Sequence, residues 1–451
     1  MKRTALGTVA TGLISAAMAT AETPTPYVFK DAPAYNAVRR VEPTAAQPAV
    51  QSVPGAAATT SAPAAPGVAD AAPMVAVDEV GGYPVGGHPL TPYGSFEFLV
   101  FGIRRGPTPP LVQVVSPEAA LVGIDTGRLP PGSVIDVFSQ FGTDPGTFAG
   151  IKAMAGVWLD SSATWGVEVG YNQLFRRSEK FAFASAGIPV IGRAFFDTAT
   201  EEPTFLYLST PDGLQRGYVT INAPTQMTGG DVNIRYNGLA VFADRTDYLA
   251  GVRYMNLREA IGIQSGTAFF APTPFGLIQT TAYDSTETFK AENEFYGAQI
   301  GSESHFRSGR WSLDVGGKLA MGGVRQSVNI SAATIVTAPN QPPQVIPNQG
   351  LLLVQLTNAG NYRRDFFAVL PEFFVRAGVQ LTPRARAMVG YNLWGLSNVI
   401  RAGATIDPVV NPNLSPFITA SAPSNQLRPR FQFNGAEFWA QGLTLGFAFD
   451  Y

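Results

Sequence analysis

The chain has 451 residues, of which 45% are hydrophobic and only 14% charged, well below the charged share of about a quarter that is usual for soluble domains. A net charge of −2 gives no basic field for a nucleic acid. The absence of cysteine, with only His88 and His305 as histidines, excludes disulfides, thiolate metal sites and a histidine cage.

The first residues predict a signal peptide, residues 1–21. Met1–Arg3 is cationic, residues 4–17 are uncharged, and Ala17–Ala21 supplies the small residues that a signal peptidase reads, so we expect cleavage after Ala21. The apolar run is shorter than the ~20 residues that span a bilayer, and no later run approaches 18. The mature chain is therefore expected to have no transmembrane helix.

Residues 22–93 are rich in Ala, Pro and Thr and show little apolar periodicity. Such a segment cannot bury enough apolar surface to become ordered, which predicts a disordered periplasmic linker. Fully extended at ~3.1 Å per residue, it would reach roughly 200 Å. Two roles are possible for this linker: it tethers the protein to peptidoglycan or another envelope component, or it is a passive filler.

Residues 94–451 alternate between large apolar and small or polar side chains, as in strands with lipid outside and a narrow lumen inside. Pro371 would remove a ladder donor inside one of these strands, so we expect a bulge there. The alternation predicts ten spanning strands: 95–104, 148–159, 164–175, 231–243, 246–258, 288–307, 310–326, 366–381, 385–398 and 437–451.

The connections between these strands alternate in length. Four are very short, and the five between them run from about 30 to 55 residues, as expected of tight periplasmic turns and long external loops. The prediction is an all-β fold: one closed antiparallel transmembrane β-barrel of about ten to twelve strands, both termini periplasmic. A hairpin hidden within 180–222 would add two strands. The short connections are Asp160–Ala163, Asp244-Arg245, Ser308-Gly309 and Thr382–Arg384.

Two aromatic features support this membrane reading. The last strand places Leu443, Leu445, Phe447, Phe449 and Tyr451 on one face, a pattern that resembles the assembly signal of bacterial outer-membrane barrels and implies the barrel-assembly machinery as a partner. The tryptophans are expected to form two interfacial girdles. Trp158, Trp165 and Trp311 would lie at the short-turn end, and Trp394 and Trp439 at the long-loop end.

The inward faces carry charges of both signs in similar number. In a narrow barrel these should pair and fill the lumen, whereas an ion-selective pore should show a ring of one sign. The main expected lumen-facing charges are Lys152, Glu168, Arg235, Arg253, Glu303, Asp314, Lys318, Glu372 and Arg376, with Glu97 and Asp450 on the same faces.

Catalysis is not expected. Ser302–His305 places hydroxyl, acidic and imidazole groups on one strand, but neighbours along one face of a strand do not bring their reactive atoms together. His88 lies in a Gly/Pro stretch typical of a loop. No phosphate-binding loop, zinc-protease or calcium-loop pattern occurs, so neither cofactor nor metal is expected.

Several stretches carry a family likeness, in matching order and spacing. They are Pro109–Val112, Pro189–Phe196, Tyr248–Glu259, Phe295–Gly301, Gly309–Trp311, Leu381–Val399, Ile406-Asp407, Val410–Pro412 and Phe438–Leu443. On these residues the chain resembles the outer-membrane β-barrel family found mainly in planctomycete-type bacteria. The resemblance implies export to the cell outer membrane and implies no known activity.

The function expected from the sequence is that of an integral outer-membrane barrel with a filled, salt-bridged lumen and a structural or surface-interaction role. Its loops, notably 176–230, 327–364 and 399–436, would face outward. Outer-membrane lipids are the expected surroundings. A passive, porin-like channel for small solutes is the alternative, and a secreted soluble all-β adhesin is disfavoured because its outward faces would be too apolar.

Overall fold

The computed structural model describes residues 90–126, 133–138, 146–238, 240, 243–420 and 422–450. The predicted signal peptide, nearly all of the predicted linker and Tyr451 lie outside these residues. Within them, no helix is both long and apolar enough to cross a membrane.

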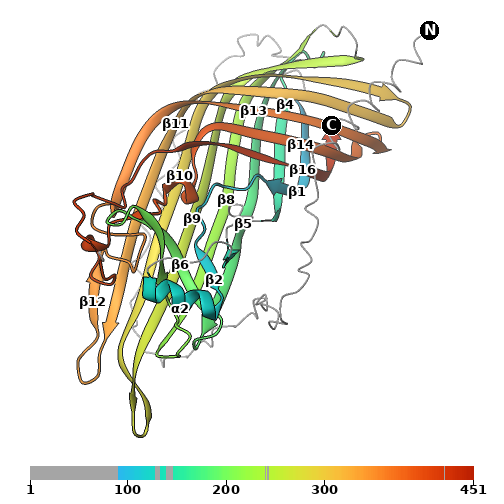
Figure 1. Cartoon of the computed structure of the whole chain (residues 1–451). Coiled ribbons are helices and arrows are strands. Elements are labelled where there is room, and N and C mark those ends of the chain that lie inside the picture. Colours follow the sequence, from blue (N-terminus) through green and yellow to red (C-terminus); the bar gives the residue numbers. More distant parts are fainter. Residues whose placement is uncertain are drawn as a thin grey trace, which may run out of the picture. The chain divides into compact units, whose positions relative to one another are not determined.

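Ten antiparallel strands pair in sequence order, and β1 closes the ring by pairing with β16. Each strand thus has a neighbour on both sides (Figure 1). The ring strands are β1 (Thr91–Ile103), β4 (Thr147–Trp158), β5 (Trp165–Ser185), β8 (Gln215–Gly238), β9 (Arg245–Thr273), β10 (Gly276–Ser308), β11 (Trp311–Thr337), β13 (Gly360–Thr382), β14 (Ala385–Ile400) and β16 (Gly435–Asp450).

The ten predicted strands are confirmed as the ten ring strands, and the four short connections lie near their predicted places, although β8 ends at Gly238 instead of residue 243. They join β4 to β5, β8 to β9, β10 to β11 and β13 to β14 at one end of the ring, here called the short-turn end. In the first of these turns, the Asp160 carboxylate accepts hydrogen bonds from the Ser162 hydroxyl and from the Trp165 and Thr164 N–H groups. These bonds, the Ser162 bond foremost, hold the pKa of Asp160 below its usual value.

At the opposite end, the loop end, the prediction of five long loops is wrong in one case. β9 and β10 continue as strands to Thr273 and Gly276, so two residues connect them instead of about 30. Ile261 and Ile263 explain the extension, because they alternate as fully buried inward side chains above the predicted strand. The expected loops 176–230 and 327–364 likewise begin as strand.

The loops that remain build a second, five-stranded sheet at the loop end (Figure 1). β6 lies at its centre, pairing with β2, β7 and β15. The hairpin anticipated within 180–222 exists as β6 and β7, but it joins this sheet and adds no strand to the ring. The loop elements are β2 (Val112–Val115), α2 (Pro117–Thr126), β3 (Val134–Phe138), β6 (Val190–Asp197), β7 (Glu202–Tyr207), β12 (Gln344–Pro347), which pairs with β11, η1 (Ala402–Thr405), β15 (Val409–Val410) and η2 (Pro412–Leu414).

The second sheet packs against inward apolar side chains of the extended ring strands. One buried cluster joins Ile191 and Phe195 of β6 to Ile221, Ile263 and Phe289 on three ring strands. Removing these side chains from water is the main force that holds the loop elements in place.

The bulge expected at Pro371 is absent. Pro371 pairs in regular register with Leu319, and the β13–β14 ladder begins one residue further on, at Glu372 and Trp394. Its missing N–H therefore costs no ladder bond. The irregularity lies instead between Gln380 and Thr382.

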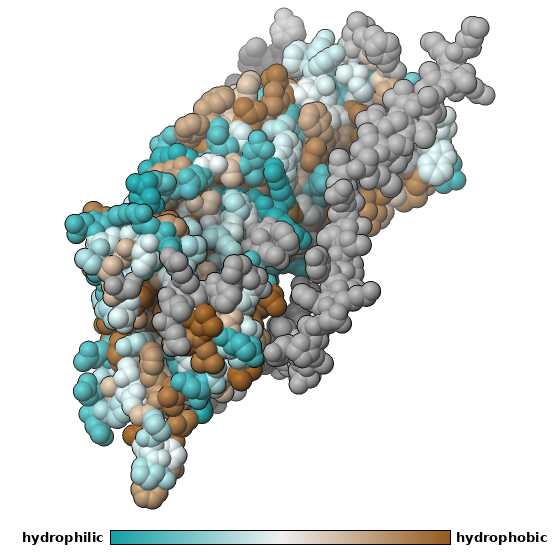
Figure 2. All heavy atoms as spheres, in the orientation of Figure 1, coloured by the Kyte–Doolittle hydropathy of each residue, from teal (hydrophilic) through white to brown (hydrophobic). Residues whose placement is uncertain are grey.

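Outward side chains of the ring are apolar over the half nearest the short turns. On β16, Leu443, Leu445, Phe447 and Phe449 are 47–57% exposed, whereas Thr444 between them is 1% exposed. Figure 2 shows exposed apolar side chains on the wall of the molecule. Large apolar groups facing away from the interior on many neighbouring strands are typical of a surface that meets lipid.

Candidate functional site

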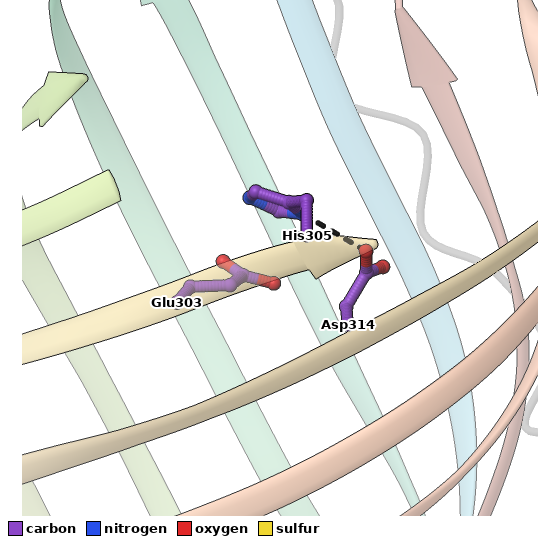
Figure 3. A group of neighbouring side chains, drawn as sticks. All are labelled: Glu303, His305 and Asp314. Atoms are coloured by element: carbon purple, nitrogen blue, oxygen red, sulfur yellow. Dashed lines mark hydrogen bonds and ion pairs between the residues drawn. The ribbon is translucent and has the colours of Figure 1, made fainter. Parts of the chain in front are cut away.

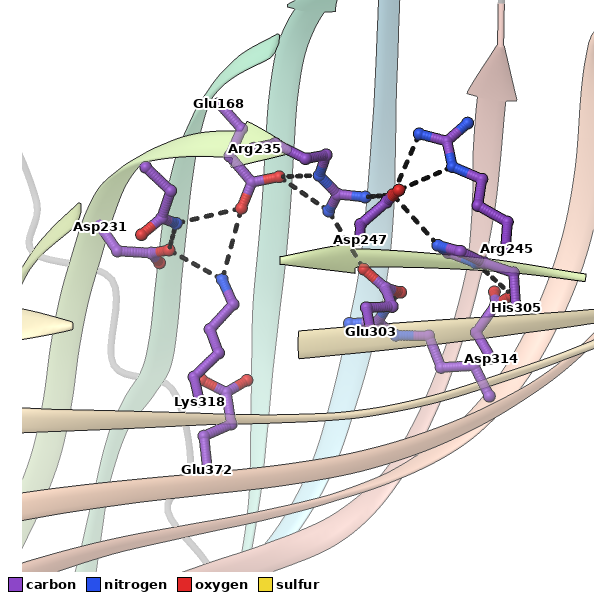
Figure 4. Close-up of polar contacts among 12 residues, drawn as sticks. Glu168, Asp231, Arg235, Arg245, Asp247, Glu303, His305, Asp314, Lys318 and Glu372 are labelled. Atoms are coloured by element: carbon purple, nitrogen blue, oxygen red, sulfur yellow. Dashed lines mark hydrogen bonds and ion pairs between the residues drawn. The ribbon is translucent and has the colours of Figure 1, made fainter. Parts of the chain in front are cut away.

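The interior of the ring near the short-turn end is filled by an ionic network, here called the charged layer (Figure 4). Its centre is the buried guanidinium of Arg235 on β8, which contacts Glu168 at 2.8 Å, Asp247 at 2.7 Å and Glu303 at 3.0 Å. One cation thus ties together β5, β8, β9 and β10. The planar guanidinium suits this role because its five N–H donors can serve several carboxylates at once.

The rest of the charged layer is also built from pairs of opposite charge, all between different strands except Arg245–Asp247, which lies within β9. Its further ion pairs are Lys152–Glu372 (2.5 Å), Arg253–Glu372 (2.5 Å), Lys318–Asp231 (2.8 Å), Lys318–Glu168 (3.6 Å), Arg376–Glu97 (3.2 Å), Arg376–Glu303 (3.0 Å), Arg386–Asp314 (3.1 Å) and Arg245–Asp247 (2.7 Å). All nine predicted lumen charges lie in it. Asp231, Asp247 and Arg386 were missed, although Asp231 alternates in step with the predicted inward residue Arg235, and Asp247 with Arg253.

His305 lies at the margin of the charged layer, between two carboxylates. Its Nδ1 is 2.8 Å from Asp314 (Figure 3), and its Nε2 is 3.3 Å from Asp247. The nearby Ser304 hydroxyl pairs with Thr246 and not with the imidazole. The arrangement joins β9, β10 and β11 and presents no Ser–His pair of the kind that nucleophilic catalysis needs.

Glu303, His305 and Asp314 are also close enough to hold a cation, since their ligand atoms lie within 4.8 Å of one another. The Glu303 carboxylate, however, is already bound by Arg235 and Arg376, each at 3.0 Å. These guanidinium groups supply the positive charge that a metal would bring, so we assign the group a structural role.

Next toward the loop end, inward side chains form an apolar layer to which every ring strand contributes. Phe101 and Trp394 pack with ring centroids 4.6 Å apart. The layer includes Leu99, Phe148, Leu174, Met227, Met255, Phe295, Val324, Leu370, Trp394 and Phe438, each 0–1% exposed. A water-filled passage at this level would wet some of these side chains, so the ring is closed here.

Beyond the apolar layer, buried ion pairs fix the loop elements to the ring. Arg193 of β6 contacts Glu287 of β10 at 2.5 Å, and both side chains are at most 1% exposed. The other oxygen of Glu287 accepts the backbone N–H groups of Leu352, Leu353 and Val354. Glu287 therefore anchors two loop segments at once.

A second anchor of this kind joins Arg401, directly after β14, to Glu259 of β9 at 2.7 Å. Sequence reasoning missed both anchors. The sequence signal for such an anchor is an acidic residue that lies on the same face of a strand as buried apolar residues. Glu287 lies in this way on the same face of β10 as Phe289 and Ala291.

Two of the five predicted interfacial tryptophans point inward. Trp394 is 0% and Trp158 is 7% exposed, because both have the strand parity of lumen residues. Trp165 and Trp311 are 50% and 68% exposed near the short turns, and Trp439 is half-buried. Tyrosines accompany them, with Tyr236, Tyr248 and Tyr296 40–54% exposed.

The fold defines the class of protein, and comparison with known proteins identifies the family. A closed antiparallel ring with an apolar outer wall is the architecture of β-barrel membrane proteins. Residues 93–451 match the model of the family described as "Putative beta barrel porin-7 (BBP7)", and the chain belongs to this family. The planctomycete part of the resemblance is not shown by this match.

No curated protein sequence matches the chain. Among solved structures, the outer membrane protease OmpT from Escherichia coli aligns with 12% identity and a TM-score of 0.32, over 80% of this chain and 97% of that one. A Pseudomonas aeruginosa FadL homologue aligns with 8% identity and a TM-score of 0.21, over 80% and 90%. Both TM-scores are below 0.5, so the fold is assigned from the strand pairings of the chain itself.

Proposed function

We propose that the protein is an integral outer-membrane β-barrel whose interior is closed by its own side chains and loops, and that its role is structural or in surface interaction. The observation that carries this proposal is the apolar layer, in which inward side chains from all ten strands are 0–1% exposed. The charged layer on one side and the second sheet on the other fill the remaining interior. In this arrangement the loop end faces outward.

The membrane location is supported by the family and by the outer wall. Apolar outward side chains start at Trp165, Tyr236 and Trp311 near the short turns, where amphipathic rings favour the membrane–water interface. The proposal takes outer-membrane lipids and the barrel-assembly machinery as partners, in a planctomycete-type envelope, and includes no catalytic step.

Planar-bilayer conductance of the refolded mature protein tests the closed interior, with heat-modifiable gel migration as the check that the ring has formed. We expect folded protein to insert without steady conductance. Steady open-channel current from folded protein would contradict the proposal and favour the passive solute channel instead. Absence of any heat-modifiable form would contradict the membrane barrel itself.

A further inference from the structure

A polar groove of about 410 Å³ lies on the wall of the ring, across β5, β8, β9, β10, β11 and β13. Exposed side chains such as Arg258 line it, whereas the inward side chains Ala291 and Val328 at the same level are 2% exposed in the core. The groove therefore opens on the outer face. Its volume is within the range of ordinary ligand sites.

The groove carries more cations than anions. Arg176, Arg258, Lys290 and Arg363 line it, and Glu292 is the outward-facing carboxylate among them. Arg258 already pairs with Glu292 at 2.6 Å. Among the described residues, the other three cations have no ion-pair partner, so the groove has an excess of positive charge available to a ligand.

Glu292 does not cancel this excess. The Glu292 carboxylate accepts hydrogen bonds from the Asn256 side-chain amide and from the Arg258 guanidinium. The carboxylate is therefore already shared between two donors, and neither Lys290 nor Arg363 makes an ion pair with it.

The groove begins just above the apolar outer wall. Tyr254 and Tyr296 pair across β9 and β10 with ring centroids 5.0 Å apart, and below them the outward residues include Val252 and Ile300, 61% and 59% exposed. Arg258, paired with Glu292, stands two outward positions above Tyr254. That places the cations at the level of lipid headgroups when the apolar wall lies in the hydrocarbon.

We propose that this groove binds the phosphorylated headgroup of an anionic lipid of the outer leaflet, with Lys290 and Arg363 as its main phosphate contacts. The inference rests on the proposed outer-membrane location. The acyl chains of the lipid lie against Val252 and Ile300, and guanidinium and ammonium groups bind phosphate oxygens through charge-assisted hydrogen bonds. A free phosphate offers the same anionic chemistry but gains nothing from the apolar wall.

Titration of the detergent-solubilised protein with lipid A carrying two phosphates, followed by native mass spectrometry, tests the inference. The variant is Lys290→Gln combined with Arg363→Gln, and the control is Arg216→Gln, an exposed cation near the loop end of β8 that does not line the groove. We expect the double variant to weaken lipid A binding by about tenfold or more, and the control to leave it unchanged.

Inorganic phosphate and phosphatidylcholine provide the other arms of the titration. Equal lipid A affinity in the double variant and the control would overturn the inference, as would binding of inorganic phosphate with no preference for the lipid. Insertion into phosphatidylcholine liposomes with heat-modifiable migration is measured separately. Failure to insert would contradict the proposed function, whereas insertion without lipid A binding would contradict this inference alone.

Discussion

Arg235→Met should destabilise the folded ring by about 3–5 kcal/mol, the cost expected when one partner of a buried ionic network is removed. Arg235 is the shared partner of Glu168, Asp247 and Glu303, and its side chain is 7% exposed. Without the Arg235 guanidinium, three carboxylates remain close together with less positive charge to balance them. The measurement is the urea concentration at which half of the protein loses its heat-modifiable, folded band.

Arg245→Met is the matched control, because Arg245 contacts a single carboxylate of the same network and its side chain is 32% exposed. We expect a much smaller shift in the urea midpoint for this variant. Equal shifts for Arg235→Met and Arg245→Met would show that the charged layer does not hold the strands together in the way described.

Glu287→Gln should release the loop segments from the ring. The substitution keeps an acceptor oxygen but leaves the buried Arg193 guanidinium without its counter-charge, again a cost of about 3–5 kcal/mol. Because about 1.4 kcal/mol is a factor of ten, we expect the Leu352–Val354 amides to exchange at least about a hundredfold faster. Hydrogen exchange of the folded protein, read by mass spectrometry over this segment, measures the effect.

Glu292→Gln, the same substitution five residues along β10, is the control. Glu292 faces outward, is about one-third exposed and pairs with the exposed Arg258. Its replacement should leave exchange of Leu352–Val354 unchanged. Unaltered exchange in Glu287→Gln as well would contradict the anchoring role assigned to Glu287.

The ring was predictable from the sequence because a strand between lipid and a narrow interior must alternate with period two. The pattern of apolar outward and polar inward side chains stops where the inward side chains become apolar, as at Ile261 and Ile263. The predicted strands therefore ended before the observed ones. Trp394 shows a related error. Its position near the end of the strand suggested the membrane interface. Trp394 lies two residues from Asn392, however, so both side chains point to the same face of the strand, and both are buried in the interior.

The second sheet could not be predicted because its pairings are short and non-local. Three residues of β2 pair with Val190–Gly192, some 75 residues further along the chain, and two residues of β15 pair with the end of β6. Segments of this length carry too little pattern to identify a partner. The anchors Arg193 and Glu287 depend on the same long-range packing.

Cysteine accessibility in the apolar layer tests the closed interior most directly, because the chain has no cysteine of its own. Ala320→Cys places one thiol in this layer at a fully buried position, and Ser161→Cys places one in an exposed turn. In folded protein in liposomes, with a membrane-impermeant maleimide on both sides, we expect labelling of Ser161→Cys and protection of Ala320→Cys. Rapid labelling of Ala320→Cys in the folded form would show a continuous aqueous path and contradict the account.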